Sequence, residues 1–228
     1  LHAARGLLGK EHFLFFCGDI AVEMDLERLI EVHMESAAAV TVVAHPNDHP
    51  HDSDLLATEE DDRICAIMPR GTRPPGYYRN LVFGSIYVLS PRVFDYIKAN
   101  TKQDLNNDVL PRMIQAEERV IAYNTPEYLR DVGTEERLAM VERDIASGLV
   151  ESMHYTKKRP AVFFARDGVL NVELGGRGIT NIDESEVIPG AAQAVRAVND
   201  AGLLSVVITN QSQVAKGFIT LKYLERLF

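Results

Sequence analysis

The stretch Phe13-Leu14-Phe15-Phe16-Cys17-Gly18-Asp19 is a hydrophobic run that stops at an acidic residue, and Ala161-Val162-Phe163-Phe164-Ala165-Arg166-Asp167 repeats this arrangement later in the chain. Short hydrophobic runs of this kind are typical of fully buried parallel strands. The carboxyl ends of such strands form the edge at which open α/β sheets bind ligands. We therefore expect an α/β fold in which each run delivers a carboxylate to such an edge.

Around the first run, strands and helices alternate over residues 1–146, which we expect to form one domain. Leu26, Leu29, Ile30 and His33 recur at helical spacing, so His33 is interpreted as a packed histidine on a hydrophobic helix face. Strands are expected over residues 40–44, 55–58, 63–68, 81–89 and 120–123, and helices from Pro91, over 108–115 and from the N-cap Thr134 to about 146.

A second domain is expected over residues 160–228, after a linker at 147–159 that contains Lys157-Lys158-Arg159. A strand, a glycine-rich loop, a helix ending near Gly202 and a strand over 204–209 predict a parallel pair joined by a right-handed crossover. Two strands in roughly 70 residues are too few to close a doubly wound core, so we expect this domain to be cut short.

The amino-acid composition excludes some classes of protein. The 228 residues carry a net charge of −9, which argues against a nucleic-acid binder, and 46% of them are hydrophobic, as in globular proteins. The two cysteines lack metal-site spacing and favour a cytoplasmic setting, and no hydrophobic run approaches the ~20 residues of a membrane span. The chain starts at Leu1 without an initiator methionine, so we expect an internal fragment.

Two acidic residues in the first domain are candidate metal ligands. Asp19 follows Gly18, whose missing side chain would permit close backbone approach, and Asp131 stands directly before a predicted helix. Either residue alone is more often ordinary loop chemistry. Two carboxylates that meet in a crevice are what Mg²⁺ needs when it also binds water and substrate phosphates.

Asp19, the strand 81–89, the segment 104–113 and Arg130-Asp131-Val132-Gly133-Thr134 together resemble the C-terminal two-thirds of sugar-1-phosphate nucleotidylyltransferases. The resemblance implies a Rossmann-like sheet with its N-terminal part missing. It also implies that Asp19 and Asp131 bind Mg²⁺, while a sugar phosphate attacks the α-phosphorus of a nucleoside triphosphate.

The sequence departs from that family in three places. The glycine-rich nucleotide loop would precede Leu1, and the sugar-contacting Asn-Ala-Gly of the family is Phe83-Gly84-Ser85 here. Arg70 stands where the family usually has a lysine near the sugar phosphate, and preserves charge but not geometry.

Asp167-Gly168-Val169-Leu170-Asn171 and the later Thr209-Asn210 resemble the haloacid dehalogenase superfamily, in its branch of heptose-bisphosphate and histidinol-phosphate phosphatases. The resemblance implies a truncated Rossmannoid unit in which Asp167 is the general acid/base and Thr209 and Asn210 hold the phosphoryl group. The nucleophilic aspartate of that superfamily is replaced by Ala165, which can neither attack phosphorus nor ligate a metal. We therefore expect no phosphatase activity from this sequence.

The order of the two domains resembles bifunctional enzymes of heptose activation, which implies GTP and heptose 1-phosphate for one half and D-glycero-D-manno-heptose 1,7-bisphosphate for the other. Tyr77, Tyr78 and Arg79 either line the sugar crevice or cover a hairpin. The alternatives are a non-catalytic binding protein that keeps the crevices and a truncated gene product.

Two other groups of residues are tempting sites. His45, His49 and His51 alternate with aspartates, but their spacing fits no zinc pattern and favours a solvated loop. Cys17 is interpreted as a small buried hydrophobic residue.

Overall fold

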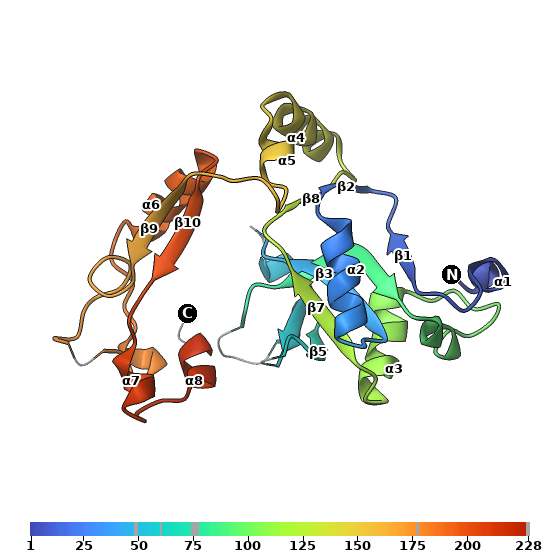
Figure 1. The fold of residues 1–228 in the computed structure, drawn as a ribbon, viewed down its shortest axis with the longest axis horizontal. Helices are drawn as coiled ribbons and strands as arrows, with labels where there is room; N and C mark the ends of the chain where they lie inside the picture. The colour runs from blue at the N-terminus through green and yellow to red at the C-terminus, as the bar shows by residue number, and fades with distance from the viewer. Residues whose placement is uncertain (48–49, 60, 74–77, 177, 227–228) are drawn as a thin grey trace. The chain divides into compact units, whose positions relative to one another are not determined.

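The computed structural model describes the chain except residues 48–49, 60, 74–77, 177 and 227–228, and the chain divides into two compact units, Leu1–Lys157 and Lys158–Phe228 (Figure 1). The boundary falls within the expected linker, but most of that range belongs to the first unit. Residues Leu149–Ser152 form the short helix α5, and the backbone N–H of Tyr155 donates to the buried carboxylate of Glu127 over 2.8 Å. The Arg28 guanidinium also lies 3.7 Å from the centre of the Tyr155 ring. A buried acid therefore holds the segment that follows α4 on the first unit.

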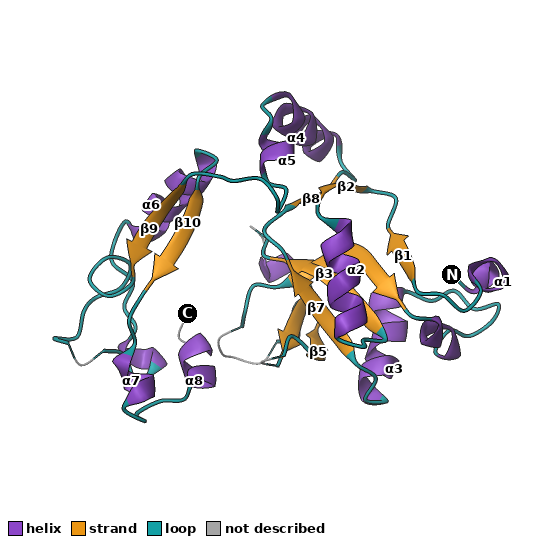
Figure 2. Ribbon diagram, in the orientation of Figure 1, coloured by secondary structure: helices purple, strands orange, loops and turns teal. Residues whose placement is uncertain are grey.

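The first unit is built on a six-stranded mixed sheet in the order β5-β4-β6-β3-β7, with β1 also paired to β6 (Figures 1 and 2). Its strands are β1 (Phe13–Phe16), β3 (Val40–His45), β4 (Leu55–Thr58), β5 (Ile64–Met68), β6 (Val82–Leu89) and β7 (Val120–Asn124). Strand β3 is parallel to β7 and antiparallel to β6. The five strands expected over residues 40–123 are confirmed to within two residues at their ends.

Strand β1 differs from the expectation of a fully buried parallel strand. It pairs antiparallel with β6, with Phe13 opposite Leu89 and Phe16 opposite Ile86, and its side chains are only half-buried or exposed. Hydrophobic periodicity reports burial but not strand direction, which the partner strand decides. Asp19 does not end β1 either: it lies in the turn before the next strand, β2 (Ile20–Glu23).

Helical segments cover both faces of this sheet. Helix α2 (Leu26–Glu35) begins at its N-cap Asp25, whose Oδ1 accepts the Arg28 N–H over 3.0 Å, and packs Leu29 against Ile86 and Val88 of β6. The alternate side chains of β6, Tyr87 and Leu89, face the other core. That core also takes residues from η3 (Pro91–Asp95), η4 (Leu105–Val109) and α3 (Leu110–Gln115). The helix expected from Pro91 is a 3-10 turn, and the Ser90 hydroxyl forms no capping hydrogen bond.

The histidine expected on the hydrophobic face of α2 is confirmed as a core residue. His33 is fully buried, with Nδ1 2.7 Å from Thr41 Oγ1 and Nε2 2.6 Å from Nδ1 of the exposed His12. Burial, with a smaller contribution from the neighbouring His12, lowers the pKa of His33 to about 4. Cys17 is half-buried, and burial raises the pKa of its thiol, as expected for an unreactive side chain.

A separate two-stranded sheet completes the first unit. Strand β2 pairs antiparallel with β8 (Tyr128–Asp131), and α4 (Glu135–Ala146) follows after a short turn. Thr134 caps α4 as expected, because its Oγ1 accepts the Arg137 N–H over 3.3 Å. The remaining short elements are η1 (His2–Ala4), α1 (Arg5–Leu8) and η2 (Pro50–Asp52).

The second unit contains the expected parallel pair. Strand β9 (Ala161–Ala165) runs parallel to β10 (Leu204–Ile208), and the connection carries η5 (Ile182–Glu184) and α6 (Ala191–Asp200) (Figures 1 and 2). Helices α7 (Ser212–Ala215) and α8 (Leu221–Arg226) follow.

Strand β9 is not the fully buried strand that was expected. The side chains of Phe163 and Ile208 are 63 and 60% exposed, because they lie on the face of the two-stranded sheet that is opposite the face packed on α6. Within the described ranges of both units, no helix has the length and hydrophobicity that a membrane span requires.

Candidate functional sites

A cavity of about 560 Å³ opens beside the sheet of the first unit. Its walls come from the carboxyl end of β3 at His45, from residues 82–85 of β6, and from β8 and α4, which contribute Arg130, Asp131 and Arg137. Leu129 and Met140 add a hydrophobic surface beside these charged side chains. The cavity therefore offers both polar and apolar contacts to a small ligand.

The structure brings the positions of Asp19 and Asp131 together. Ile20 is opposite Asp131 in the β2–β8 pair, and the Val132 N–H donates to the carbonyl oxygen of Asp19 over 2.9 Å. Asp131 faces the cavity, whereas the exposed Asp19 is not among its lining residues. Their shared role as metal ligands stays a prediction.

The Asp131 carboxylate already has two donors. Its Oδ1 accepts the Gly133 N–H over 2.7 Å and Nη1–H of Arg137 over 2.8 Å. Among the described residues, no group of three or more His, Cys, Asp or Glu side chains is placed to hold a metal ion. Two carboxylates at the ends of paired strands still fit Mg²⁺, which takes one or two protein ligands and completes its shell with water and phosphate oxygens.

One wall of the cavity depends on unusual backbone at Gly84 and Ser85. A Cβ at Gly84 would lie 2.9 Å from both the Val43 carbonyl oxygen and Leu129 Cδ1, at the bulge where β3 shifts its register on β6. Ser85 has φ of 60°, a left-handed conformation that costs a residue with a side chain about 1–2 kcal/mol. Gly18, by contrast, has open space around its Cβ position and no positive φ, so the expected close approach there is not observed.

Two expected substrate residues of the first unit lie outside this lining. Arg70 is exposed, and its backbone N–H donates over 2.8 Å to Oδ1 of Asp54, which does line the cavity. Tyr78 is half-buried and is not a lining residue. Asp48, His49 and Tyr77 fall outside the described residues, so the expectations for them are not examined by the structure.

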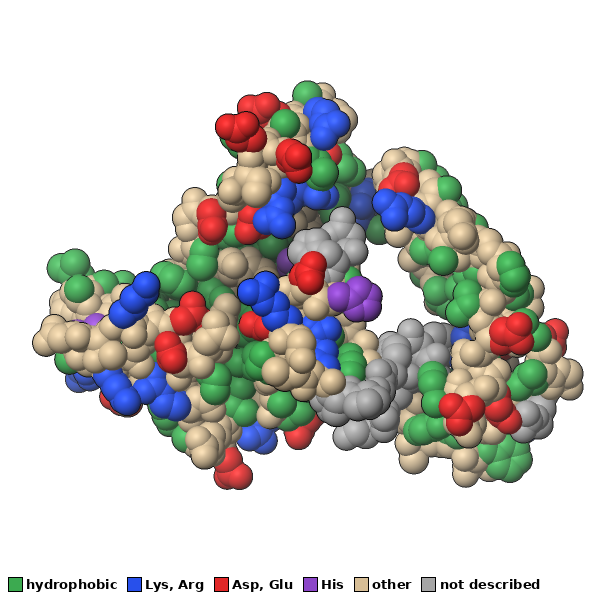
Figure 3. Space-filling view, turned by 180° about the vertical axis from the view of Figure 1, so that it is seen from behind, with side chains coloured by type: hydrophobic (Ala, Val, Ile, Leu, Met, Phe, Trp, Pro, Cys, Tyr) green, Lys and Arg blue, Asp and Glu red, His purple; other side chains and the backbone are tan. Residues whose placement is uncertain are grey.

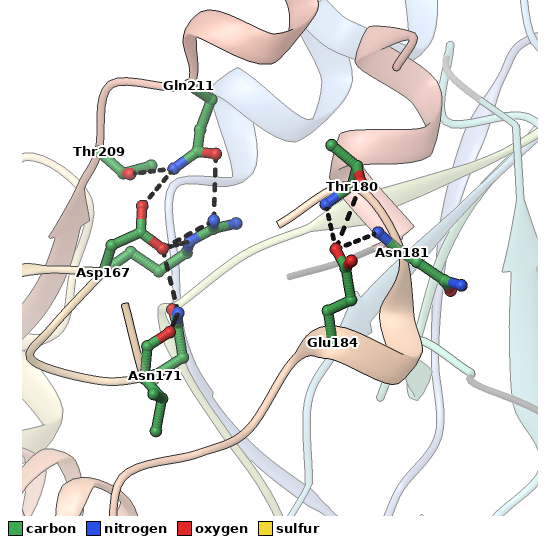
Figure 4. A network of polar contacts seen from close by, with 9 residues as sticks. Asp167, Asn171, Thr180, Asn181, Glu184, Thr209 and Gln211 are labelled. Carbon is green, nitrogen blue, oxygen red and sulfur yellow. Dashed lines mark hydrogen bonds and ion pairs between the residues drawn. The ribbon is translucent and has the colours of Figure 1, made fainter. Parts of the chain in front are cut away.

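The second unit gathers its predicted residues where β9 and β10 end. Ile208 is opposite Ala165 in the parallel register, so Asp167 and Thr209 follow neighbouring strand ends. Gln211 links them, because its Nε2 donates to Asp167 Oδ2 over 2.8 Å and to Thr209 Oγ1 over 2.6 Å (Figure 4). The convergence of these two positions at the sheet edge is as expected.

Asp167 is the centre of this hydrogen-bond network. Its Oδ1 accepts Asn171 Nδ2–H over 3.0 Å and two N–H groups of Arg166, over 3.0 Å from Nε and 2.9 Å from Nη2 (Figure 4). Partial burial raises the pKa of Asp167, but these hydrogen bonds, that of Gln211 and the Arg166 charge outweigh it and leave the pKa lowered. Asp167 is therefore an ionised carboxylate at neutral pH, which suits a base better than an acid.

Some site roles were not predicted from the sequence. Arg137 was not a candidate and His45 was assigned to a solvated loop, yet both line the first cavity. Arg166, Asn171 and Gln211 were given no role, and they hold Asp167 in the second unit. Ala165 is exposed at the end of β9 and Asn210 is exposed beside Thr209. Arg166 is 5% exposed, and a buried arginine needs an acidic partner. The sequence signal for this role is the position of Arg166, directly between a hydrophobic strand and Asp167.

Comparisons with known proteins agree with this geometry. The profile of the nucleotidyl transferase family matches residues 1–148. A mannose-1-phosphate guanylyltransferase of Mycobacterium tuberculosis is 25% identical over 148 residues, which are 64% of this chain and 40% of that protein. A UTP–glucose-1-phosphate uridylyltransferase of Synechocystis is 22% identical over 189 residues, covering 78% and 48% of the two chains.

A different relative is the D-glycero-D-manno-heptose-1,7-bisphosphate 7-phosphatase of Thermosynechococcus vestitus, 45% identical over 69 residues that make up 30% of this chain and 34% of that protein. The chain thus spans between a third and a half of the length of these three relatives.

Solved structures share the α/β fold. HddC from Yersinia pseudotuberculosis superposes with a TM-score of 0.51 and 20% identity, over 63% of this chain and 60% of HddC. A Bacillus anthracis protein assigned as a glucose-1-phosphate thymidylyltransferase gives a TM-score of 0.53 and 16% identity, over 68% and 61%. The Rossmann-like class expected from the sequence is thereby confirmed. With the profile match covering most of its length, the chain belongs to the nucleotidyl transferase family.

Proposed function

We propose that the first unit is part of an enzyme that transfers a nucleotidyl group from a nucleoside triphosphate to a sugar 1-phosphate. The observation that carries the proposal is the position of Asp131 in the wall of the cavity, directly beside the strand that follows Asp19. The family membership and the sugar-phosphate nucleotidyltransferases among the relatives support the same reaction class.

In this reaction a phosphate oxygen of the sugar 1-phosphate attacks the α-phosphorus of the triphosphate. The bond to the bridging oxygen breaks, and pyrophosphate leaves with its electrons. The protein's contribution is positioning and charge compensation, because both substrates are highly anionic. Arg130 and Arg137 supply positive charge at the cavity wall, and the Leu129–Met140 surface offers contact to the sugar ring.

We also propose a divalent metal at Asp19 and Asp131, with Mg²⁺ favoured. Such an ion would compensate phosphate charge beside the two carboxylates. Asp131 would have to share its carboxylate with, or take it from, Arg137 and Gly133.

For the substrates, we propose GTP and a heptose 1-phosphate. The guanylyltransferase relative supports GTP, and the heptose bisphosphatase relative supports the sugar. We assign the phosphatase match to the second unit, because the nucleotidyl transferase profile accounts for residues 1–148. Arg70, Tyr78, Thr209 and Asn210 remain proposed contacts to phosphate or substrate.

The second unit is proposed to retain a phosphatase site that has lost its nucleophile. Gln211 links Asp167 to Thr209, which supports this proposal, whereas the exposed methyl group of Ala165 offers no atom that can form a phosphoryl-enzyme. A site with this content binds phosphate without hydrolysing it, which is the second candidate function.

The first proposal is tested by measuring pyrophosphate release by the full chain with Mg²⁺, heptose 1-phosphate and either GTP, ATP or UTP. Asp131→Asn should lower the rate by about 100-fold or more, because a ligand of the proposed metal, which would compensate the phosphate charge, is lost. Asp95→Asn, at an exposed acid of the same unit, is the matched control. Activity that survives Asp131→Asn unchanged refutes the role of Asp131.

The second proposal is tested with Ala165→Asp in the full chain, and Ala201→Asp, at the exposed end of α6, as control. Phosphate release from heptose 1,7-bisphosphate should appear only in Ala165→Asp. Equal rates in all three proteins would show that position 165 is not the nucleophile position.

A further inference from the structure

Two arginines on the cavity wall differ in where their partners lie. Arg130 donates Nη1–H to the Met140 sulfur over 2.8 Å, and its Nε lies 3.7 Å from the carboxylate of Asp144, which is outside the cavity lining. Asp144 also accepts a hydrogen bond from the Tyr128 hydroxyl, which holds this partner of Arg130 in position. Arg137 instead pairs with Asp131, which itself lines the cavity. A ligand that enters the cavity therefore meets both partners of this second pair.

The charges on the wall compensate one another. The described lining contains two positively charged residues, Arg130 and Arg137, and two negatively charged ones, Asp54 and Asp131. Basic and acidic side chains are accordingly mixed on the face of the first unit shown in Figure 3. A phosphate group gains little from such a wall unless one of the carboxylates is occupied by another cation.

Separating the Arg137–Asp131 pair also costs little free energy. The two side chains are 41 and 51% exposed, and pairs of this kind contribute at most about 1 kcal/mol. The planar guanidinium can offer a phosphate two parallel N–H donors, which is stronger than its single contact to Asp131 Oδ1. The contact with Asp131 meanwhile keeps the Arg137 side chain close to the cavity wall. Arg137 therefore loses little rotamer freedom when it binds a phosphate.

We propose that Arg137 is a phosphate-binding residue of this cavity, held against Asp131 until a phosphorylated ligand and a divalent cation separate the pair. The proposal rests on the function proposed above and adds a specific exchange to it: the cation takes Asp131, and the released guanidinium takes the phosphate. The competing explanation is purely structural. In that case Arg137 ties the first turn of α4 to the end of β8, and neither ligand depends on it.

The exchange predicts a change in two binding affinities, whereas the structural explanation predicts none, and both affinities can be measured without catalysis. The proteins are the full chain, Arg137→Gln, Arg137→Lys and the control Arg143→Gln, whose exposed arginine lies on the same helix outside the cavity. The probes are α-D-mannose 1-phosphate in the presence of saturating Mg²⁺, by calorimetry, and Mn²⁺ alone, by electron paramagnetic resonance.

Arg137→Gln should bind the sugar phosphate about tenfold or more weakly, because a charge-assisted contact is lost. The same variant should bind Mn²⁺ about two- to fivefold more tightly, because the competitor for Asp131 is gone. Arg137→Lys should lie between, and Arg143→Gln should match the parent. A sugar-phosphate affinity that is unchanged in Arg137→Gln, or a Mn²⁺ affinity that fails to rise, overturns the exchange.

Asp131→Asn separates this failure from a failure of the proposed function. If Asp131→Asn abolishes Mn²⁺ binding while Arg137→Gln changes neither affinity, only the exchange is wrong. If Mn²⁺ binds Asp131→Asn as it binds the parent, the metal assignment itself is wrong, and the exchange is overturned with it.

Discussion

The buried His33 makes the stability of the first unit depend on pH. Its pKa is about 4 in the folded chain, against 6.5 in an unfolded one, because the imidazole is completely buried and has His12 as its neighbour. The unfolded chain therefore binds a proton in a range where the folded chain does not, and stability is lost as pH falls from 6.5 to 4. The difference of roughly 2.5 pKa units corresponds to about 3 kcal/mol. Above pH 7 both states are neutral at this position and the effect disappears.

The assay is urea unfolding at pH values between 4 and 7.5 for the full chain and for His33→Gln, followed by a probe of the first unit such as hydrogen exchange in α2. Glutamine can still bond to Thr41 but does not titrate, so the parent should lose about 3 kcal/mol more than the variant between pH 6.5 and 4. His51→Gln, at an exposed histidine, corrects for the general loss of an imidazole. A stability difference that is flat over this range refutes the reasoning.

Two further predictions concern the backbone of the cavity wall. Gly84→Ala should destabilise the first unit by about 1–3 kcal/mol in urea unfolding, because the new Cβ meets the carbonyl oxygen of Val43 at 2.9 Å, whereas Gly18→Ala, in open space, should cost much less; equal effects would contradict the close contact. Ser85→Gly should raise the melting temperature and stabilise the unit by about 0.5–1 kcal/mol, because glycine removes the left-handed strain at φ 60°. Ser90→Gly, at φ −79°, should instead destabilise, and a loss of stability in both variants would rule out strain at Ser85.

The local features of the fold follow from local sequence. Asp25, the spacing of Leu29 and His33, and the β-branched run from Val40 are sufficient to predict α2 and β3, because capping and periodicity act over a few residues. The parallel arrangement of β9 and β10 is equally accessible, since the helix between them requires a crossover.

Features that depend on contacts between residues far apart in the chain could not be predicted from the sequence. The direction of β1 is set by β6, about 70 residues later, and the anchoring of Tyr155 depends on the buried Glu127. In the site, the pairing of Arg137 with Asp131 requires the particular turn between β8 and α4. The motifs in the sequence therefore indicate the candidate carboxylates, such as Asp131. They do not indicate the arginine that pairs with it, Arg137.

The uncovered face of the β9–β10 sheet has a practical consequence for handling the protein. Phe163 and Ile208 present an exposed hydrophobic surface on the same face of adjacent strands, and such a surface drives association as concentration rises. Light scattering should accordingly increase with concentration, and replacing Ile208 with threonine should delay this increase while keeping the β-branched shape. Crystallisation trials would then start from the variant rather than from the parent.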